Sequence, residues 1–401
     1  MKFRPRSCLG VVAALGIFLV SFVLFAEIGA RVMYPRPDSS EHFETHPEMG
    51  YALHPGASVM LHFRDELKPP GRDYRFTVSS QGFRDREYGP KAEDEFRILL
   101  LGDSFTAGVG MDEEHMPSRL LEQEFKGAWP GRRIVVINAG TPGHGPWQER
   151  LNLLQRGLPL EPDVVVHQLY LTNDVHDEMR RVDQVLEAYE RLADYFWRRH
   201  AFREHWNVAL DGWLQDHSRA YAQYLWRTGP RLPLMRALSP LGMLGAYAPP
   251  SFTPPADREP YFEHALVEPN ALLLQSFALI EESILATKAD CEARSIRYLA
   301  YAQPDRGYVL GEELSDGPSG QKYDRDRDVT VLEDFFKQEN IDFVPLGYTL
   351  RRHPRGRSAF FGYDGHMKEI GNQILAETIA NTLYEKEVFP RIRRSIPKPA
   401  R

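Results

Sequence analysis

The sequence predicts an α/β fold in which helices cover a doubly wound parallel sheet. Two observations carry this prediction: short apolar runs rich in β-branched and aromatic residues, and helical stretches that separate those runs. The first run, Arg97–Asp103, is continuous and ends in Gly-Asp, as is typical of a strand buried on both faces of a parallel sheet. Four further strands are expected at Ile134–Gly140, Asp163–Leu171, Arg297–Gln303 and Ile341–Leu346.

The clearest helix between these strands is expected over Ala271–Ala293. Its apolar residues recur at helical spacing and leave charged residues on the other faces. The apolar positions are Leu273, Phe277, Ile280 and Ile284. A second helix is expected near the C-terminus, from Glu369 to Glu387.

Charge and cysteine content exclude several classes of protein. The net charge of −7 provides no basic field that would collect phosphates, so nucleic acid is excluded as a partner. The only two cysteines, Cys8 and Cys291, are too few for a disulfide framework or a cysteine zinc site.

The N-terminus predicts a membrane anchor within residues 1–34. Leu9–Ala26 is uncharged and mostly apolar, and as a helix it would be about 27 Å long, enough to span a bilayer core. Basic residues precede it, so the positive-inside rule places everything after Glu27 across the membrane. These residues are Lys2, Arg4 and Arg6. A cleaved signal peptide is the alternative. Either reading exports the main domain to the periplasm or the cell exterior.

The rest of the chain divides into three parts, the second of which carries an insertion. Residues 35–95 are predicted to be a stalk and lead-in arm, with Phe76–Val78 as the only strand-like piece, and residues 96–390 the main domain. The stretch 175–270 is too long for a simple connection between two parallel strands, so we expect a mostly helical insertion there. Residues 391–401 are expected to form a basic tail. Packing within the insertion is favoured for its tryptophans over an acyl, glycan or membrane platform. They are Trp197, Trp206, Trp213 and Trp226.

Polar residues follow the predicted strands where an open α/β sheet binds its ligands. The first strand ends in Gly102-Asp103-Ser104, which places a serine on a turn expected to lead into the N-terminus of the next helix. Free N–H groups there favour a developing anion. Taken alone, Ser104 is as well explained as a helix cap.

Three other segments supply what a nucleophilic serine needs. The turn Asn138–Gly143 can present a backbone N–H, and Asn173 in Thr-Asn-Asp a side-chain N–H, so that with the Ser104 N–H they form an oxyanion hole. His366 supplies a base, with Asp364 two residues before it to orient the imidazole.

With these four segments in this order, the chain resembles the SGNH/GDSL hydrolases, whose fold is flavodoxin-like and whose members include esterases, lipases, thioesterases and carbohydrate deacetylases. The resemblance runs from Arg97 to Lys386, interrupted by the insertion. It implies that Ser104 in GDSFTAGVG is the nucleophile, and that Gly143 in NAGTPG and Asn173 in LTND complete the oxyanion hole.

The resemblance further implies that Asp364 and His366 are the acid and base. Two departures are visible. The acid and base are spaced Asp-x-His where many members have Asp-x-x-His, and Leu171-Thr172 replaces the usual glycine before Asn173.

Together these features predict a serine esterase that acts on an acyl ester of an envelope carbohydrate or lipid through an acyl-enzyme, without a metal or organic cofactor. An acyltransferase that moves acetyl groups onto an exported polysaccharide is the first alternative, and a non-catalytic glycan-binding protein the second. His144 and His176 lie beside the motifs and could line the cleft, but solvated or capping roles are favoured for them.

Overall fold

The computed structural model describes most of the main domain and part of the N-terminal segment. The described residues are 16–18, 20–29, 42–63, 72–126, 129, 131–182, 265–269, 271–314, 322–362 and 365–389.

A five-stranded parallel sheet forms the centre of the main domain, as the apolar runs predicted. Its strands are β5 (Glu95–Gly102), β6 (Arg133–Gly140), β7 (Val164–Leu169), β8 (Arg297–Ala302) and β9 (Asp342–Phe343). They lie in the order β6-β5-β7-β8-β9, the order of a flavodoxin-like doubly wound sheet. The chain reverses its direction of winding at β5, so the crevice beyond the ends of β5 and β7 is where such a sheet binds its ligand.

Two of the predicted strands are shorter than expected. β9 ends at Phe343 because Pro345 cannot donate to a ladder, and helix α12 begins at Leu346. β7 ends at Leu169 because Leu171 already begins helix α4.

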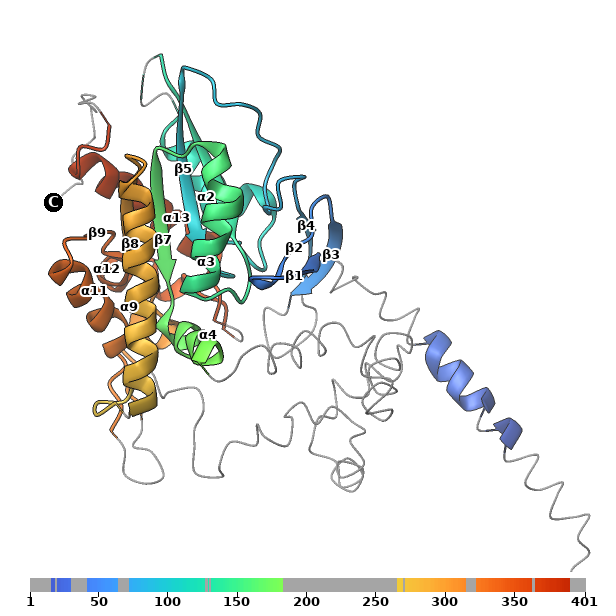
Figure 1. Cartoon of the computed structure of the whole chain (residues 1–401). Coiled ribbons are helices and arrows are strands. Elements are labelled where there is room, and N and C mark those ends of the chain that lie inside the picture. Colours follow the sequence, from blue (N-terminus) through green and yellow to red (C-terminus); the bar gives the residue numbers. More distant parts are fainter. Residues whose placement is uncertain are drawn as a thin grey trace, which may run out of the picture. The chain divides into compact units, whose positions relative to one another are not determined.

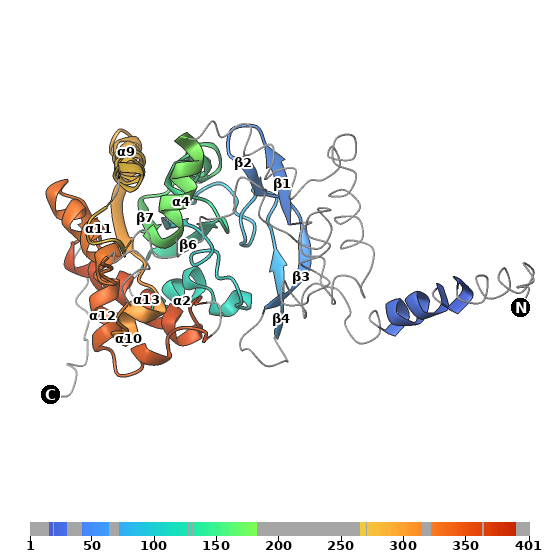
Figure 2. The ribbon, with the colours of Figure 1, turned by 90° about the horizontal axis from the view of Figure 1, so that it is seen from below.

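Helices cover both faces of the sheet (Figure 2). On one face, α9 packs against α3 and α4, and on the other, α13 packs against α2 and α12. The first three span Pro146–Asn152 (α3), Leu171–Val182 (α4) and Ala271–Glu292 (α9), and the others Pro117–Glu124 (α2), Leu346–Arg352 (α12) and Glu369–Glu385 (α13). Helices α10 (Arg306–Leu310) and α11 (Arg327–Gln338) and the short turns η1 (Glu113–His115), η2 (Leu153–Gly157), η3 (Leu158–Leu160) and η9 (Gly356–Ser358) complete the described helical elements.

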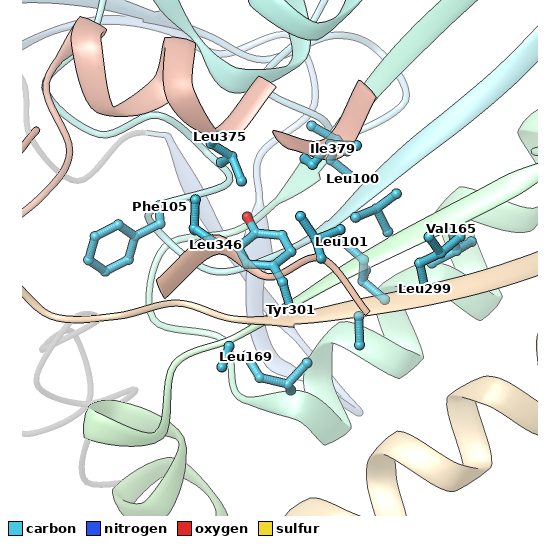
Figure 3. Packing of buried hydrophobic residues seen from close by; sticks show 14 of the residues in the cluster. Leu100, Leu101, Phe105, Val165, Leu169, Leu299, Tyr301, Leu346, Leu375 and Ile379 are labelled. Carbon is cyan, nitrogen blue, oxygen red and sulfur yellow. The ribbon is translucent and has the colours of Figure 1, made fainter. Parts of the chain in front are cut away.

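Apolar packing holds these layers together (Figure 3). Leu99 and Leu101 of β5 and Val165 of β7 are fully buried, and Leu375 of α13 covers the sheet from one side. Burying a side chain of this size contributes about 1.5–3 kcal/mol. The sheet is therefore the rigid base from which the strand-end loops emerge.

The segment before the sheet forms two antiparallel hairpins, where the sequence predicted one strand-like piece in a stalk and arm. Figure 1 shows them beside the end of the sheet. The strands are β1 (Phe43–His46) with β2 (Gly50–Leu53), and β3 (Ser58–Phe63) with β4 (Arg72–Thr77). In β4 the apolar residues Tyr74 and Phe76 alternate with polar or charged ones, so only half of this strand stands out as apolar in the sequence.

Arg84 joins the hairpins to the main domain. Its side chain is 2% exposed and lies over the rings of Tyr74 and Phe76 in β4. Its guanidinium donates to the carbonyls of Ala107 (2.8 Å), Gly108 (2.6 Å), Met111 (2.5 Å) and Arg75 (3.1 Å). One buried side chain thus fixes the hairpins against the loop that follows β5.

Several predicted features fall wholly or largely outside the described residues. They are Cys8, the first part of the predicted span Leu9–Ala26, most of the insertion 175–270 with its four tryptophans, and the tail 391–401. Residues 16–18 and 20–29 are helical. In the part of the chain that the structure describes, none of the helices has the length and hydropathy required to cross a bilayer.

Candidate active site

Ser104 lies directly after β5, in a loop fixed by hydrogen bonds. The Asp103 carboxylate accepts from the Phe105 N–H (2.8 Å), and Gln168 Oε1 at the end of β7 accepts from the Thr106 hydroxyl (2.9 Å). Within the described residues, the Ser104 N–H donates to no protein acceptor. This N–H is therefore available for an anion.

The helix expected to begin at Ser104 is replaced by a series of turns. Residues 104–110 are turns, and α2 begins only at Pro117. Gly108 and Gly110 have φ values of +69° and +80°, which a right-handed helix does not allow. The prediction that Ser104 leads into the N-terminus of the next helix is therefore wrong, and the N–H groups of the turns remain as the source of anion stabilisation.

His366 approaches Ser104 from the loop before α13. Its Nε2 lies 2.8 Å from Ser104 Oγ, within hydrogen-bond reach of a base and its nucleophile. The imidazole packs on Phe105, with the ring centroids 4.9 Å apart, and edge-on to Phe63 of β3 at 6.2 Å. Ser104 and His366, which are far apart in sequence, thus lie side by side. Phe63 of the second hairpin contacts the His366 ring and helps to position it. Asp364 lies outside the described residues.

Asn173 is held by Asp103. Its Nδ2 donates to Asp103 Oδ2 at 3.1 Å. The opposite orientation of the amide would place its oxygen against the carboxylate. One hydrogen of the amide is engaged in this bond, and the second is left for another acceptor.

Gly143 lies in the turn after β6, next to the end of β5. The Thr141 N–H donates to the Gly102 carbonyl (2.9 Å), which ties this turn to the strand that precedes Ser104. Gly143 has φ +78°, and an added Cβ would lie 2.5 Å from the Tyr51 hydroxyl, so only glycine fits. Its N–H donates to no protein acceptor in the described part of the chain.

Burial sets the charge of the groups behind the site. Asp103 is fully buried, and burial raises its pKa despite the N–H groups of Phe105 and Asn173 that favour the carboxylate. Burial also raises the pKa of Asp174 well above the usual range. These carboxyl groups therefore hold a proton more readily than exposed ones do.

His144 is a buried, neutral group, where a solvated or capping histidine was favoured. Its side chain is fully buried, and burial lowers its pKa to about 3. Its Nε2 lies 3.0 Å from the Tyr51 carbonyl oxygen, an acceptor that fixes the proton on Nε2. The side chain of His176 lies outside the described residues.

A second buried histidine, His167 of β7, lies on the face of the strand opposite Gln168. Its Nε2 is 2.7 Å from Glu149 Oε2 and its Nδ1 is 2.7 Å from the Tyr298 hydroxyl. Burial lowers the pKa of His167 to about 3 and raises that of Glu149. This chain of polar groups lies within the fold and makes no hydrogen bond to Ser104 or His366 among the described contacts.

Sequence reasoning missed three residues that fix the loops of the site. Gln168 is the easiest of the three to recognise in the sequence, because a polar residue inside an apolar, fully buried strand is unusual. Arg84 and Tyr51 carry no such signal, since arginine and tyrosine are common in exposed loops and strands. Among the described residues, no group of three or more His, Cys, Asp or Glu could hold a metal ion.

The fold is similar to that of solved lipases and esterases. A lipase/acylhydrolase from Enterococcus faecalis is 12% identical, with 73% of this chain and 96% of that chain covered and a TM-score of 0.39. A protein of the G-D-S-L family from Desulfitobacterium hafniense is 11% identical (72% and 99% covered, TM-score 0.36). An acetyl xylan esterase from Geobacillus stearothermophilus is 11% identical (72% and 94% covered, TM-score 0.37).

One of these three solved structures is described as a G-D-S-L family protein, and the other two as a lipase/acylhydrolase and an acetyl xylan esterase. A scan against protein-family models found no match, and neither did a search of curated proteins.

Proposed function

We propose that this protein is a serine esterase that cleaves an acyl ester through an acyl-enzyme. The observation that carries the proposal is the 2.8 Å approach of His366 Nε2 to Ser104 Oγ, at the crevice where a doubly wound sheet binds its ligand. A serine hydroxyl is a weak nucleophile until a base takes its proton, and His366 is placed to take it.

In the proposed mechanism His366 accepts the Ser104 proton as the oxygen attacks the ester carbonyl. The tetrahedral oxyanion is bound by the N–H groups of Ser104 and Gly143 and by the amide of Asn173, and removal of one such donor typically costs about 10²–10³ in kcat. His366 then protonates the leaving alcohol and activates water to release the acyl group.

Two carboxylates support this chemistry in different ways. Asp103 holds the Asn173 amide through the 3.1 Å hydrogen bond. Asp364, two residues before the base, is proposed from its place in the sequence to orient the His366 imidazole and stabilise its charged form.

We further propose that the N-terminal segment anchors the chain in a membrane, with the main domain outside the cytoplasm. The support is the apolar stretch Leu9–Ala26 behind three basic residues. The substrate would then be an acylated carbohydrate or lipid of the cell envelope. Protease digestion of spheroplasts, in which the outer envelope is open and the inner membrane is sealed, tests the orientation. Degradation of the main domain in sealed spheroplasts supports it, and protection of that domain until the inner membrane is lysed contradicts it.

Acyl release by the detergent-purified full chain tests the enzymatic proposal. We expect hydrolysis of p-nitrophenyl acetate to fall by at least about 10⁴-fold in Ser104→Ala and His366→Ala, with unchanged thermal unfolding. Full activity of Ser104→Ala would exclude the mechanism. Added oligosaccharide distinguishes the products: free acetate indicates an esterase, and acetylated sugar an acyltransferase with the same nucleophile.

A further inference from the structure

Tyr51 of hairpin strand β2 makes a contact with the turn that carries Gly143. Its hydroxyl donates to the Pro142 carbonyl oxygen at 3.0 Å. Pro142 C=O and Gly143 N–H belong to one peptide unit, which is planar and, in its usual trans form, directs the oxygen and the hydrogen to opposite sides. A hydrogen bond that fixes the oxygen therefore fixes the direction of the N–H.

We propose that Tyr51 is a positioning residue that aims the Gly143 N–H into the oxyanion hole and strengthens it as a donor. The inference rests on the proposed function, because it concerns the N–H assigned there to the oxyanion. It assigns to the N-terminal hairpins a part in the chemistry, through a residue that does not itself touch the substrate.

Several contacts fix the direction of the Gly143 N–H. The Tyr51 hydroxyl lies against Gly143, 2.5 Å from the position that a Cβ on this glycine would occupy. The Tyr51 carbonyl accepts from His144 Nε2 at 3.0 Å, so the tyrosine holds the turn on both sides of Gly143. The ring is itself supported by edge contacts with Phe43 (5.3 Å) and His144 (5.0 Å).

The strengthening follows from the polarity of the amide. A donor on the carbonyl oxygen draws electron density from the nitrogen, so the N–H of the same unit becomes a stronger donor, and chains of hydrogen bonds reinforce one another in this way. The hydroxyl, the Pro142–Gly143 amide and a developing oxyanion form such a chain. Its gain grows as negative charge builds up on the oxygen, so it is larger in the transition state and the tetrahedral intermediate than in the bound ester.

Tyr51→Phe tests the inference, because it removes the hydroxyl and keeps the ring. We expect kcat for p-nitrophenyl acetate to fall about tenfold with KM unchanged, less than the loss of a whole oxyanion donor. Affinity for a trifluoromethyl ketone, which forms a tetrahedral oxyanion on the serine, should fall by the same factor. A structural role alone would not link these two losses.

Tyr88→Phe is the matched control. Its hydroxyl lies 2.7 Å from Asp85 Oδ2 and 3.0 Å from the backbone carbonyl oxygen of Val136 inside β6, away from the Gly143 turn. We expect this variant to lose stability with kcat and inhibitor affinity unchanged. Phe43→Leu, which removes the support of the Tyr51 ring, should give a smaller fall in kcat and serves as the second variant if Tyr51→Phe does not fold.

Unchanged kcat and inhibitor affinity in a folded Tyr51→Phe would overturn the inference, as would equal losses in Tyr88→Phe. Ser104→Ala, assayed beside them, separates this result from the proposed function. An inactive Ser104→Ala with a fully active Tyr51→Phe removes only the role of Tyr51, whereas an active Ser104→Ala removes the mechanism on which both rest.

Discussion

The sheet and the N-terminal hairpins contribute to the site by different physical means. The sheet is held by the burial of continuous apolar strands, and its strand ends place Ser104 and Asn173. The hairpins join the main domain both by apolar packing, as of Phe63 on Phe361, and by directional hydrogen bonds to backbone carbonyls, among them those from Arg84 and Tyr51. Apolar packing tolerates small shifts, whereas hydrogen bonds depend on angle. The hydrogen bonds from the hairpins are therefore suited to orient the loops that follow the strands of the sheet.

Replacing Arg84 should have the largest effect on stability. Arg84→Met leaves the carbonyls of Ala107, Gly108 and Met111 without their buried donor, and we expect the free energy of unfolding to fall on the order of 4 kcal/mol. Because this loop follows Ser104, kcat per folded molecule should fall as well. Urea unfolding and active-site titration measure the two effects. Wild-type unfolding of the variant would show that the hairpins are held by other contacts.

A substitution that leaves a cavity beside the sheet should lower the free energy of unfolding without lowering kcat. Leu99 of β5 is fully buried in the core, and Leu99→Ala should lower the free energy of unfolding by about 3 kcal/mol. We expect kcat per folded molecule to remain at the wild-type value, because the strand ends stay in place. A fall in kcat as large as in Arg84→Met would show that the sheet and the hairpins do not differ in their contribution to the site.

A pH-dependent effect on stability is expected at Asp328 of helix α11, beside Thr172. Its Oδ2 accepts from the hydroxyl of Thr172, the neighbour of Asn173, and burial raises its pKa to about 8. The folded state therefore holds a proton that the unfolded state releases near pH 4. The stability due to this group is present below pH 4 and is lost as the pH rises to 8.

Asp328→Asn removes that dependence. Between pH 5 and 8 the stability of the variant relative to wild type should rise by up to about 1.4 kcal/mol per pH unit. Urea unfolding of both proteins at pH 5, 6.5 and 8 measures the difference, and Asp334→Asn on the exposed face of the same helix is the control. Parallel stability curves for wild type and Asp328→Asn would show that Asp328 titrates as an exposed carboxyl.

The sequence predicted the parts of the molecule that burial determines. The strands β5 to β9 and helix α9 were predicted because their apolar residues are continuous or recur at helical spacing. The order of the motifs identified Ser104 and His366 as partners, and the structure places them within hydrogen-bond distance. Boundaries failed where a local residue ended an element, as Pro345 does after β9. A hydrogen bond between a side chain and a distant carbonyl leaves no period in the sequence, so Tyr51 and Arg84 could be recognised only in the folded chain.

The central claim is that Ser104 is a nucleophile activated by His366, and covalent trapping tests it most directly. The full chain is treated with a fluorophosphonate, digested and analysed by mass spectrometry. The account predicts one phosphonyl group per molecule, on the peptide that contains Ser104, and at least about 10³-fold slower labelling in His366→Ala. Labelling of another residue, or labelling of Ser104 at the same rate without His366, would contradict it.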